Sequence, residues 1–71
     1  MFVVTIHEDD LASGTRIDEL NLEEDDAYIL LVHNGKELIP PTKDFTLQPG
    51  HSLIIISKDE RFLAKIKGAT T

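Results

Sequence analysis

The sequence predicts an α+β domain: a small, mostly antiparallel β-sheet with two short helices, in the order β-α-β-β-β-α. Apolar runs rich in β-branched residues are typical of strands, and three occur here, at residues 2–7, 27–32 and 52–56. Turn dipeptides follow the second run and precede the third. Two helix-start patterns lie after the first and third runs, and no linker, repeat or low-complexity segment interrupts the order of the elements.

The first run predicts a strand over Phe2–His7, which a charged segment ends. Thr15 and Asp18 then match the side-chain cap followed three residues later by an acid that begins many helices. We expect one or two helical turns, because the acidic run 23–26 follows at once.

The second run is apolar without interruption, which indicates a strand covered on both faces. Asn34-Gly35 comes directly after it. Both residues tolerate the positive φ of a type I′ turn, so we expect a tight hairpin between strands 27–33 and 36–39. Pro40-Pro41 should stop the second strand, because neither proline can donate to a β-ladder.

The C-terminal third predicts a short extended piece over residues 45–47, a type II turn over 48–51 and a strand over 52–56. Ser57 and Glu60 match a capping box for a final helix. The apolar stripe of this helix is predicted to be Phe62, Leu63 and Ile66. We expect the tail 69–71 to fray.

Composition bounds the function. The 71 residues make one domain, 1–71, and their number leaves open whether the chain is a fragment of a larger polypeptide. Asp and Glu number 13 against 7 Lys and Arg, a net charge of −6, and no basic stripe with aromatics appears, which disfavours nucleic-acid binding. The longest apolar run is far shorter than the roughly 20 residues of a membrane span, so we expect no direct membrane insertion. Cysteine is absent, in keeping with a cytoplasmic location.

The apolar strands also predict a partner. The two short helices can cover one face of the sheet, and the other face would show Tyr28, Leu30 and Val32, or their alternates, to water. An apolar patch of a few hundred Å² is unusual on a monomer. A small domain also gains from self-association. We therefore expect a homodimer, unless the helices cover more of the sheet.

The order and spacing of several motifs carry a resemblance to a known family. They are a glycine before a helix that ends in an acid-Leu pair, an apolar strand, a turn with glycine, a strand ending in proline, and a Leu-x-x-Gly turn before an apolar strand. In this chain they read Gly14 to Leu20, Ala27 to Val32, His33-Asn34-Gly35, Glu37 to Pro41, and Leu47 to Ile56. Over nearly its whole length the chain resembles the RCK-C (TrkA-C) family, the C-terminal regulatory domains of potassium channels, potassium transporters and cation–proton antiporters.

This resemblance implies a cytoplasmic, dimeric, ligand-sensing domain that regulates a linked membrane channel, transporter or antiporter. Some members bind cyclic di-AMP between two subunits, and others respond to divalent cations. A ligand that fits one subunit arrangement better shifts the population toward it. No cofactor is implied, and we expect no enzymatic activity, because the sequence holds no nucleophile motif, P-loop or dinucleotide fingerprint.

The predicted ligand-binding residues lie around the hairpin: His33, Asn34, Ile39, Pro40 and Pro41. Ile39 and the prolines would supply apolar walls, and His33 and Asn34 polar groups. Ordinary turn and strand-end roles also explain each of them. The family often has Arg at the position of His33 and usually Asp at that of His51. Histidine replaces a forked, permanently charged phosphate donor only in part.

Metal binding finds weaker support. His7, His33 and His51 match no zinc spacing, and we expect them to be surface or turn residues. The acidic runs 8–10 and 23–26 offer oxygen ligands for Ca²⁺ but lack an EF-hand spacing, so solvated turns are the better interpretation.

Two other functions stay open. Residues 32–37 and 47–50 also loosely resemble ubiquitin-like (β-grasp) sulfur carriers, although the chain lacks their Gly-Gly tail and ends in Gly68-Ala69-Thr70-Thr71. The third alternative is an oligomerisation module without a ligand.

Overall fold

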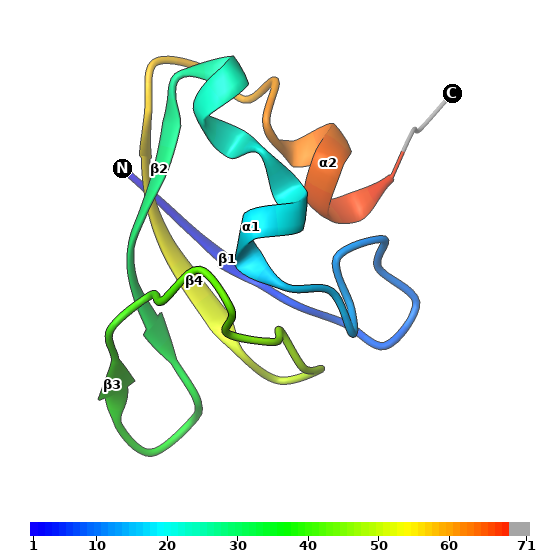
Figure 1. The fold of residues 1–71 in the computed structure, drawn as a ribbon, viewed down its shortest axis with the longest axis vertical. Helices are drawn as coiled ribbons and strands as arrows, with labels where there is room; N and C mark the ends of the chain where they lie inside the picture. Colours follow the sequence, from blue (N-terminus) through cyan, green and yellow to red (C-terminus); the bar gives the residue numbers. More distant parts are fainter. Residues whose placement is uncertain (69–71) are drawn as a thin grey trace.

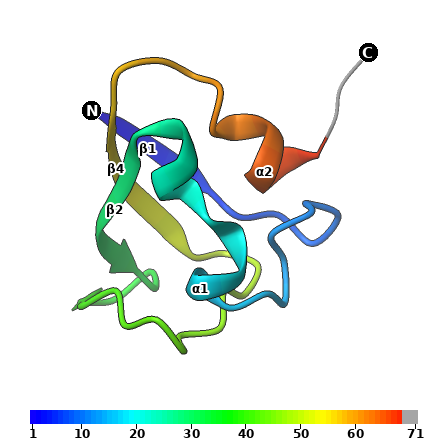
Figure 2. The same ribbon diagram turned by 45° about the horizontal axis from the view of Figure 1, so that its top comes forward.

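The computed structural model describes residues 1–68. Its elements are β1 (Phe2–Thr5), α1 (Ile17–Leu20), the 3₁₀ helix η1 (Leu22–Asp25), β2 (Ala27–His33), β3 (Leu38–Ile39), β4 (Ser52–Ser57) and α2 (Leu63–Lys67). The strands form one sheet in the order β1-β4-β2-β3, and all neighbours are antiparallel. The helices lie on one side of this sheet (Figures 1 and 2). The predicted α+β class is confirmed; the predicted fraying of residues 69–71 lies outside the described residues.

The core lies between the sheet and the helices. Alternation along β4 sends Leu53 and Ile55 inward, where both are fully buried, and leaves Ile54 and Ile56 on the opposite face. Phe62 and Ile66 of the C-terminal helical segment pack on the inward face and are also fully buried. The ring of Phe62 meets that of Phe2 edge to face, with centroids 5.2 Å apart. The C-terminal segment is therefore part of the core.

A β-bulge in β2 explains why its apolar run is unbroken. Ile29 pairs with Ile55 and Leu31 with Ile54, so Leu30 is an extra residue without a partner on β4. The alternation shifts at this point. We expected Tyr28, Leu30 and Val32, or else their alternates, to share the exposed face. The bulge divides the first set, because Tyr28 and Leu30 are exposed whereas Val32 is fully buried.

The β2–β3 hairpin is confirmed, but its turn is longer than predicted. Val32 pairs with Ile39 and His33 with Leu38, so residues 34–37 form the loop. Within this loop only Gly35 has a positive φ, of 97°, whereas a type I′ turn needs two residues with positive φ. The Asn34 Oδ1 accepts hydrogen bonds from the backbone N–H groups of Lys36 and Glu37, both at 2.9 Å. An Asx-type turn, stabilised by the Asn34 side chain, replaces the predicted backbone turn.

Both predicted helix caps were wrong. The Thr15 hydroxyl donates to the carbonyl of Ala12 at 2.7 Å, and Arg16 is the N-cap of α1. The Glu19 carboxylate caps the N-terminus of α1 by accepting the backbone N–H of Arg16 at 3.1 Å. Ser57 bonds within its own turn, to the Asp59 carbonyl at 2.8 Å, and α2 begins only at Leu63. Ser, like Thr, readily forms such local side-chain to backbone bonds instead of a cap.

The smaller elements mostly match expectation. The first strand ends at Thr5 rather than His7. The extended piece at residues 45–47 is confirmed by a bridge from Thr46 to Arg16. A turn forms at residues 48–51, where the His51 N–H donates to the Gln48 carbonyl at 3.1 Å and Gly50 has a φ of 94°.

Candidate functional site

The predicted ligand-binding residues divide between the two faces of the sheet. His33 pairs with Ser52 and with Leu38, and these three residues lie in one row across the sheet on the face away from the helices. The His33 Nδ1 accepts the Gly35 N–H at 3.1 Å, which leaves Nε2 as the donor of the neutral ring. Asn34 is occupied by the loop hydrogen bonds already described. Their role in ligand binding stays a prediction.

The apolar members of this set point elsewhere. Ile39 pairs with the buried Val32 and packs against the core, so it faces the helices. Pro40 is exposed. Pro41 lines a small cavity of about 140 Å³ on the helix side of β2, together with residues of α1, η1 and β2. The five predicted residues are therefore neighbours along the chain but do not form one pocket wall.

Metal-ligand clusters are absent from residues 1–68: no three His, Asp or Glu side chains gather there in an arrangement that could hold an ion. The His51 Nδ1 accepts the Gln48 N–H at 3.2 Å, and its ring lies against that of Phe45 with centroids 5.5 Å apart. His51 therefore has a local role in its turn. No helix of the described part is long and apolar enough to cross a membrane.

The face of the sheet away from the helices is a second candidate site, which we call the outer face. Its apolar members are Val3, Tyr28, Leu30, Leu31, Leu38, Ile54 and Ile56, as the register and exposure indicate. Its polar members are Thr5, Ser52 and His33. None of the four strands contains Asp, Glu, Lys or Arg. In a chain with a net charge of −6, this face is both apolar and free of permanent charge.

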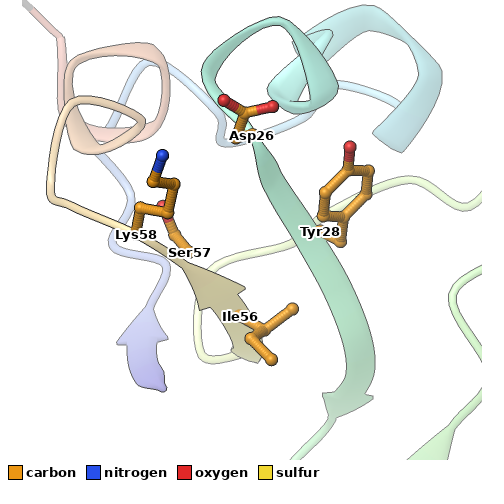
Figure 3. A pocket seen from close by; sticks show the side chains of 5 residues that line it. All are labelled: Asp26, Tyr28, Ile56, Ser57 and Lys58. Atoms are coloured by element: carbon orange, nitrogen blue, oxygen red, sulfur yellow. The ribbon is translucent and has the colours of Figure 1, made fainter.

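At one end of the outer face lies a hollow of about 500 Å³, lined by Asp26, Tyr28, Ile56, Ser57 and Lys58. Figure 3 shows these side chains around the ends of β2 and β4. The hollow lies at the opposite end of β2 from the hairpin. The sequence reasoning missed it, although the only Tyr of the chain next to an acidic run, and a Lys after an apolar strand, are visible signals.

Ion pairs fasten the helical side of the molecule. Lys65 Nζ lies 3.1 Å from Glu24 and 3.4 Å from Asp25, and thereby joins α2 to η1. Hydrogen bonding and charge attraction from these carboxylates outweigh desolvation and raise the pKa of Lys65. The Asp59 carboxylate accepts from the Arg61 backbone and side chain, which lowers the pKa of Asp59. The Lys65 contacts join two helical segments, whereas the Asp59–Arg61 pair is local to the turn before α2.

Comparison with protein-family models decides the family. The model described as the TrkA-C domain matches residues 1–67. The chain belongs to the TrkA-C family. Comparison with curated proteins finds no significant match. The family match spans both sequence segments that resembled a ubiquitin-like module, and it decides against that alternative. TrkA-C domains are regulatory domains associated with the transport of potassium and other cations, and this TrkA-C domain is assigned that general role.

Proposed function

We propose that this TrkA-C domain acts as a cytoplasmic homodimer that binds a small effector near the dimer interface and passes its signal to a linked channel, transporter or antiporter. The role is binding rather than catalysis. One observation carries the proposal: the chain concentrates apolar, uncharged side chains on the outer face, and no part of residues 1–68 covers them.

The outer face suits pairing with an identical copy. The centres of protein interfaces are depleted in charge, as this face is. Two chains of net charge −6 repel one another, so their contact is favoured where neither presents a carboxylate. A two-fold dimer uses the same patch on both copies, and a patch centred on Val3, Leu31 and Ile54, which share one row of the sheet, satisfies this condition.

Sedimentation of single-site variants tests the pairing. Leu30 is 47% exposed, so Leu30→Lys leaves the core intact. The substitution places a charge in the contact and removes a leucine that the dimer would bury, so it should weaken the dimer about 10- to 100-fold. The matched control is Leu11→Lys: Leu11 is 61% exposed but lies on the loop after β1, away from the outer face. A wild-type chain that sediments as a monomer at high concentration contradicts the proposal.

The effector is proposed to be a nucleotide such as cyclic di-AMP or a divalent cation. Support comes from the family and from His33, whose Nε2–H is available at the hairpin end of the outer face. Calorimetric titration with cyclic di-AMP and with Ca²⁺ tests it. His33→Ala should weaken nucleotide binding, and His7→Ala, which changes an exposed histidine of the loop after β1, should not. If neither ligand binds, the ligand-free oligomerisation module is the better function.

A further inference from the structure

The hollow at the ends of β2 and β4 has the dimensions of a small-ligand site. Its volume is about 500 Å³, and it is broadly open to solvent, so it suits a small ligand that is bound with one side exposed. It is separate from the hairpin residues considered above, because His33 and Asn34 lie at the other end of β2. Nothing in the proposed cyclic di-AMP or cation site uses its lining.

Two apolar side chains form its floor. Tyr28 and Ile56 are direct partners across β2 and β4, so they stand side by side on the outer face. Both are half exposed, at 53% and 50%. An aromatic ring beside a branched aliphatic chain offers a flat or branched apolar group a contact on two sides.

Two opposite charges stand at the rim. Ala27 pairs with Ser57, which places Asp26 and Lys58 at the same end of the antiparallel pair, one before β2 and one after β4. Figure 3 shows the Asp26 carboxylate and the Lys58 ammonium on either side of the gap between the strand ends. Among residues 1–68 neither side chain makes a hydrogen bond or an ion pair, although Asp26 lies within electrostatic range of Arg61 and Lys58 within that of Asp59. A ligand that carries one charge of each sign complements both.

Charge complementarity separates the ligand classes. A simple anion would be attracted by Lys58 but repelled by Asp26 and by the net charge of −6. A simple cation would be attracted by Asp26 but repelled by Lys58. A molecule with a carboxylate, an ammonium and an apolar group satisfies the two rim charges and the floor together.

We propose that this hollow binds a small zwitterion with an apolar side group, of the chemical class of an aromatic or branched α-amino acid. Its carboxylate lies toward Lys58, its ammonium toward Asp26, and its side group on Tyr28 and Ile56. The regulatory meaning of this site rests on the proposed effector role. Because Tyr28 and Ile56 also belong to the outer face, occupancy of the hollow changes the surface that a second copy would meet.

Two-dimensional NMR of the 71-residue chain with L-phenylalanine tests the site. We expect saturable shifts in the backbone signals of residues 26–28 and 56–58 below about 10 mM ligand. Hydrocinnamate lacks the amine and phenethylamine lacks the carboxylate, so each should bind about three- to fivefold more weakly, the change expected for one exposed ion pair. Absence of saturable shifts, or equal binding of all three compounds, overturns the proposal.

Matched variants localise the binding. Lys58→Gln and Asp26→Asn should each weaken phenylalanine binding about three- to fivefold, because each removes one attractive rim charge. Lys58→Gln should not weaken phenethylamine binding, and Asp26→Asn should not weaken hydrocinnamate binding, because each variant removes the charge that repels that ligand. Asn tolerates the left-handed backbone of Asp26, whose φ is 55°. The controls are Lys36→Gln and Asp9→Asn, both exposed and outside the hollow. Controls that weaken binding as much as the rim variants contradict the site.

The same samples separate this site from the proposed pairing. Sedimentation of the rim variants reports on the dimer, and NMR shifts of the Leu30→Lys variant report on the hollow. Retained binding in a chain that never dimerises contradicts only the proposed dimer. A dimer that gives no shifts with phenylalanine contradicts only the zwitterion site.

Discussion

The Nζ of Lys67 lies 2.7 Å from the Asp10 carboxylate and 2.6 Å from the carbonyl oxygen of Thr5. One ammonium thereby fastens the last turn of α2 to the chain that leaves β1. Asp10 also accepts the His7 N–H at 2.8 Å, and its side chain is only 10% exposed. The contact joins two segments 57 residues apart in sequence and keeps the C-terminal helix against the sheet.

This contact predicts a loss of stability in acid. The hydrogen bond from Lys67 is the main cause that holds the pKa of Asp10 below its usual value of 3.8. A depressed carboxyl pKa contributes stability above the unfolded value, and that stability is lost as the pH falls through the folded value. Denaturant titrations from pH 7 downward should therefore show a decline that begins near pH 5 and continues below pH 4.

Asp10→Asn isolates this contribution. It should lower the free energy of unfolding at pH 7 by about 1 kcal/mol, since Lys67 is partly exposed, and should flatten the decline in acid. Asp9→Asn changes the exposed neighbour and should stay within about 0.5 kcal/mol of wild type. If both variants decline with pH as wild type does, the Asp10–Lys67 contact is not the source.

Phe62 lies at the centre of the core although it precedes the first residue of α2. Its ring is fully buried against Phe2. Phe62→Ala should lower the free energy of unfolding by about 3–5 kcal/mol, because a large cavity remains. In a domain this small the variant should be largely unfolded by circular dichroism at 25 °C. Leu38→Ala, at a residue 55% exposed, is the control and should remain folded.

The β2–β3 loop depends on one side-chain oxygen and one glycine. Asn34→Ala removes the acceptor of two backbone N–H groups and should lower the free energy of unfolding by about 1 kcal/mol. Gly35→Ala places a Cβ at a φ of 97°, where no neighbouring atom is close, so its cost, also about 1 kcal/mol, is purely conformational. Thermal unfolding measures both. Lys36→Ala, in the same loop, should have little effect.

The bulge predicts an unusual tolerance to deletion. Without Leu30, Leu31 still meets Ile54 and Ile29 still meets Ile55, so every other side chain of β2 keeps its face. The shortened chain should fold with the same core. Deletion of Ile54 is the contrasting change, since β4 has no spare residue and part of the strand would turn its core side chains outward. Circular dichroism and amide exchange distinguish the two; equal loss of structure in both contradicts the assigned register.

Local sequence patterns predicted the elements because their causes are local. Proline and glycine constrain the backbone wherever they occur, so the hairpin, the turn before β4 and the end of β3 were placed correctly. The capping predictions were wrong, because Thr15 and Ser57 each found a backbone carbonyl within their own turn. Several partners lie within reach of a serine or threonine hydroxyl, and spacing along the chain does not choose among them.

The sequence alone determined the α+β class, the existence of the hairpin, the family resemblance and the excess of apolar residues over what two helices can cover. These follow from backbone preferences and composition. Only the tertiary structure decided which face each β2 side chain occupies, because a single extra residue at Leu30 reverses the alternation. It also decided that Asp26, Tyr28, Ile56 and Lys58 surround one hollow, since antiparallel pairing joins chain segments some thirty residues apart.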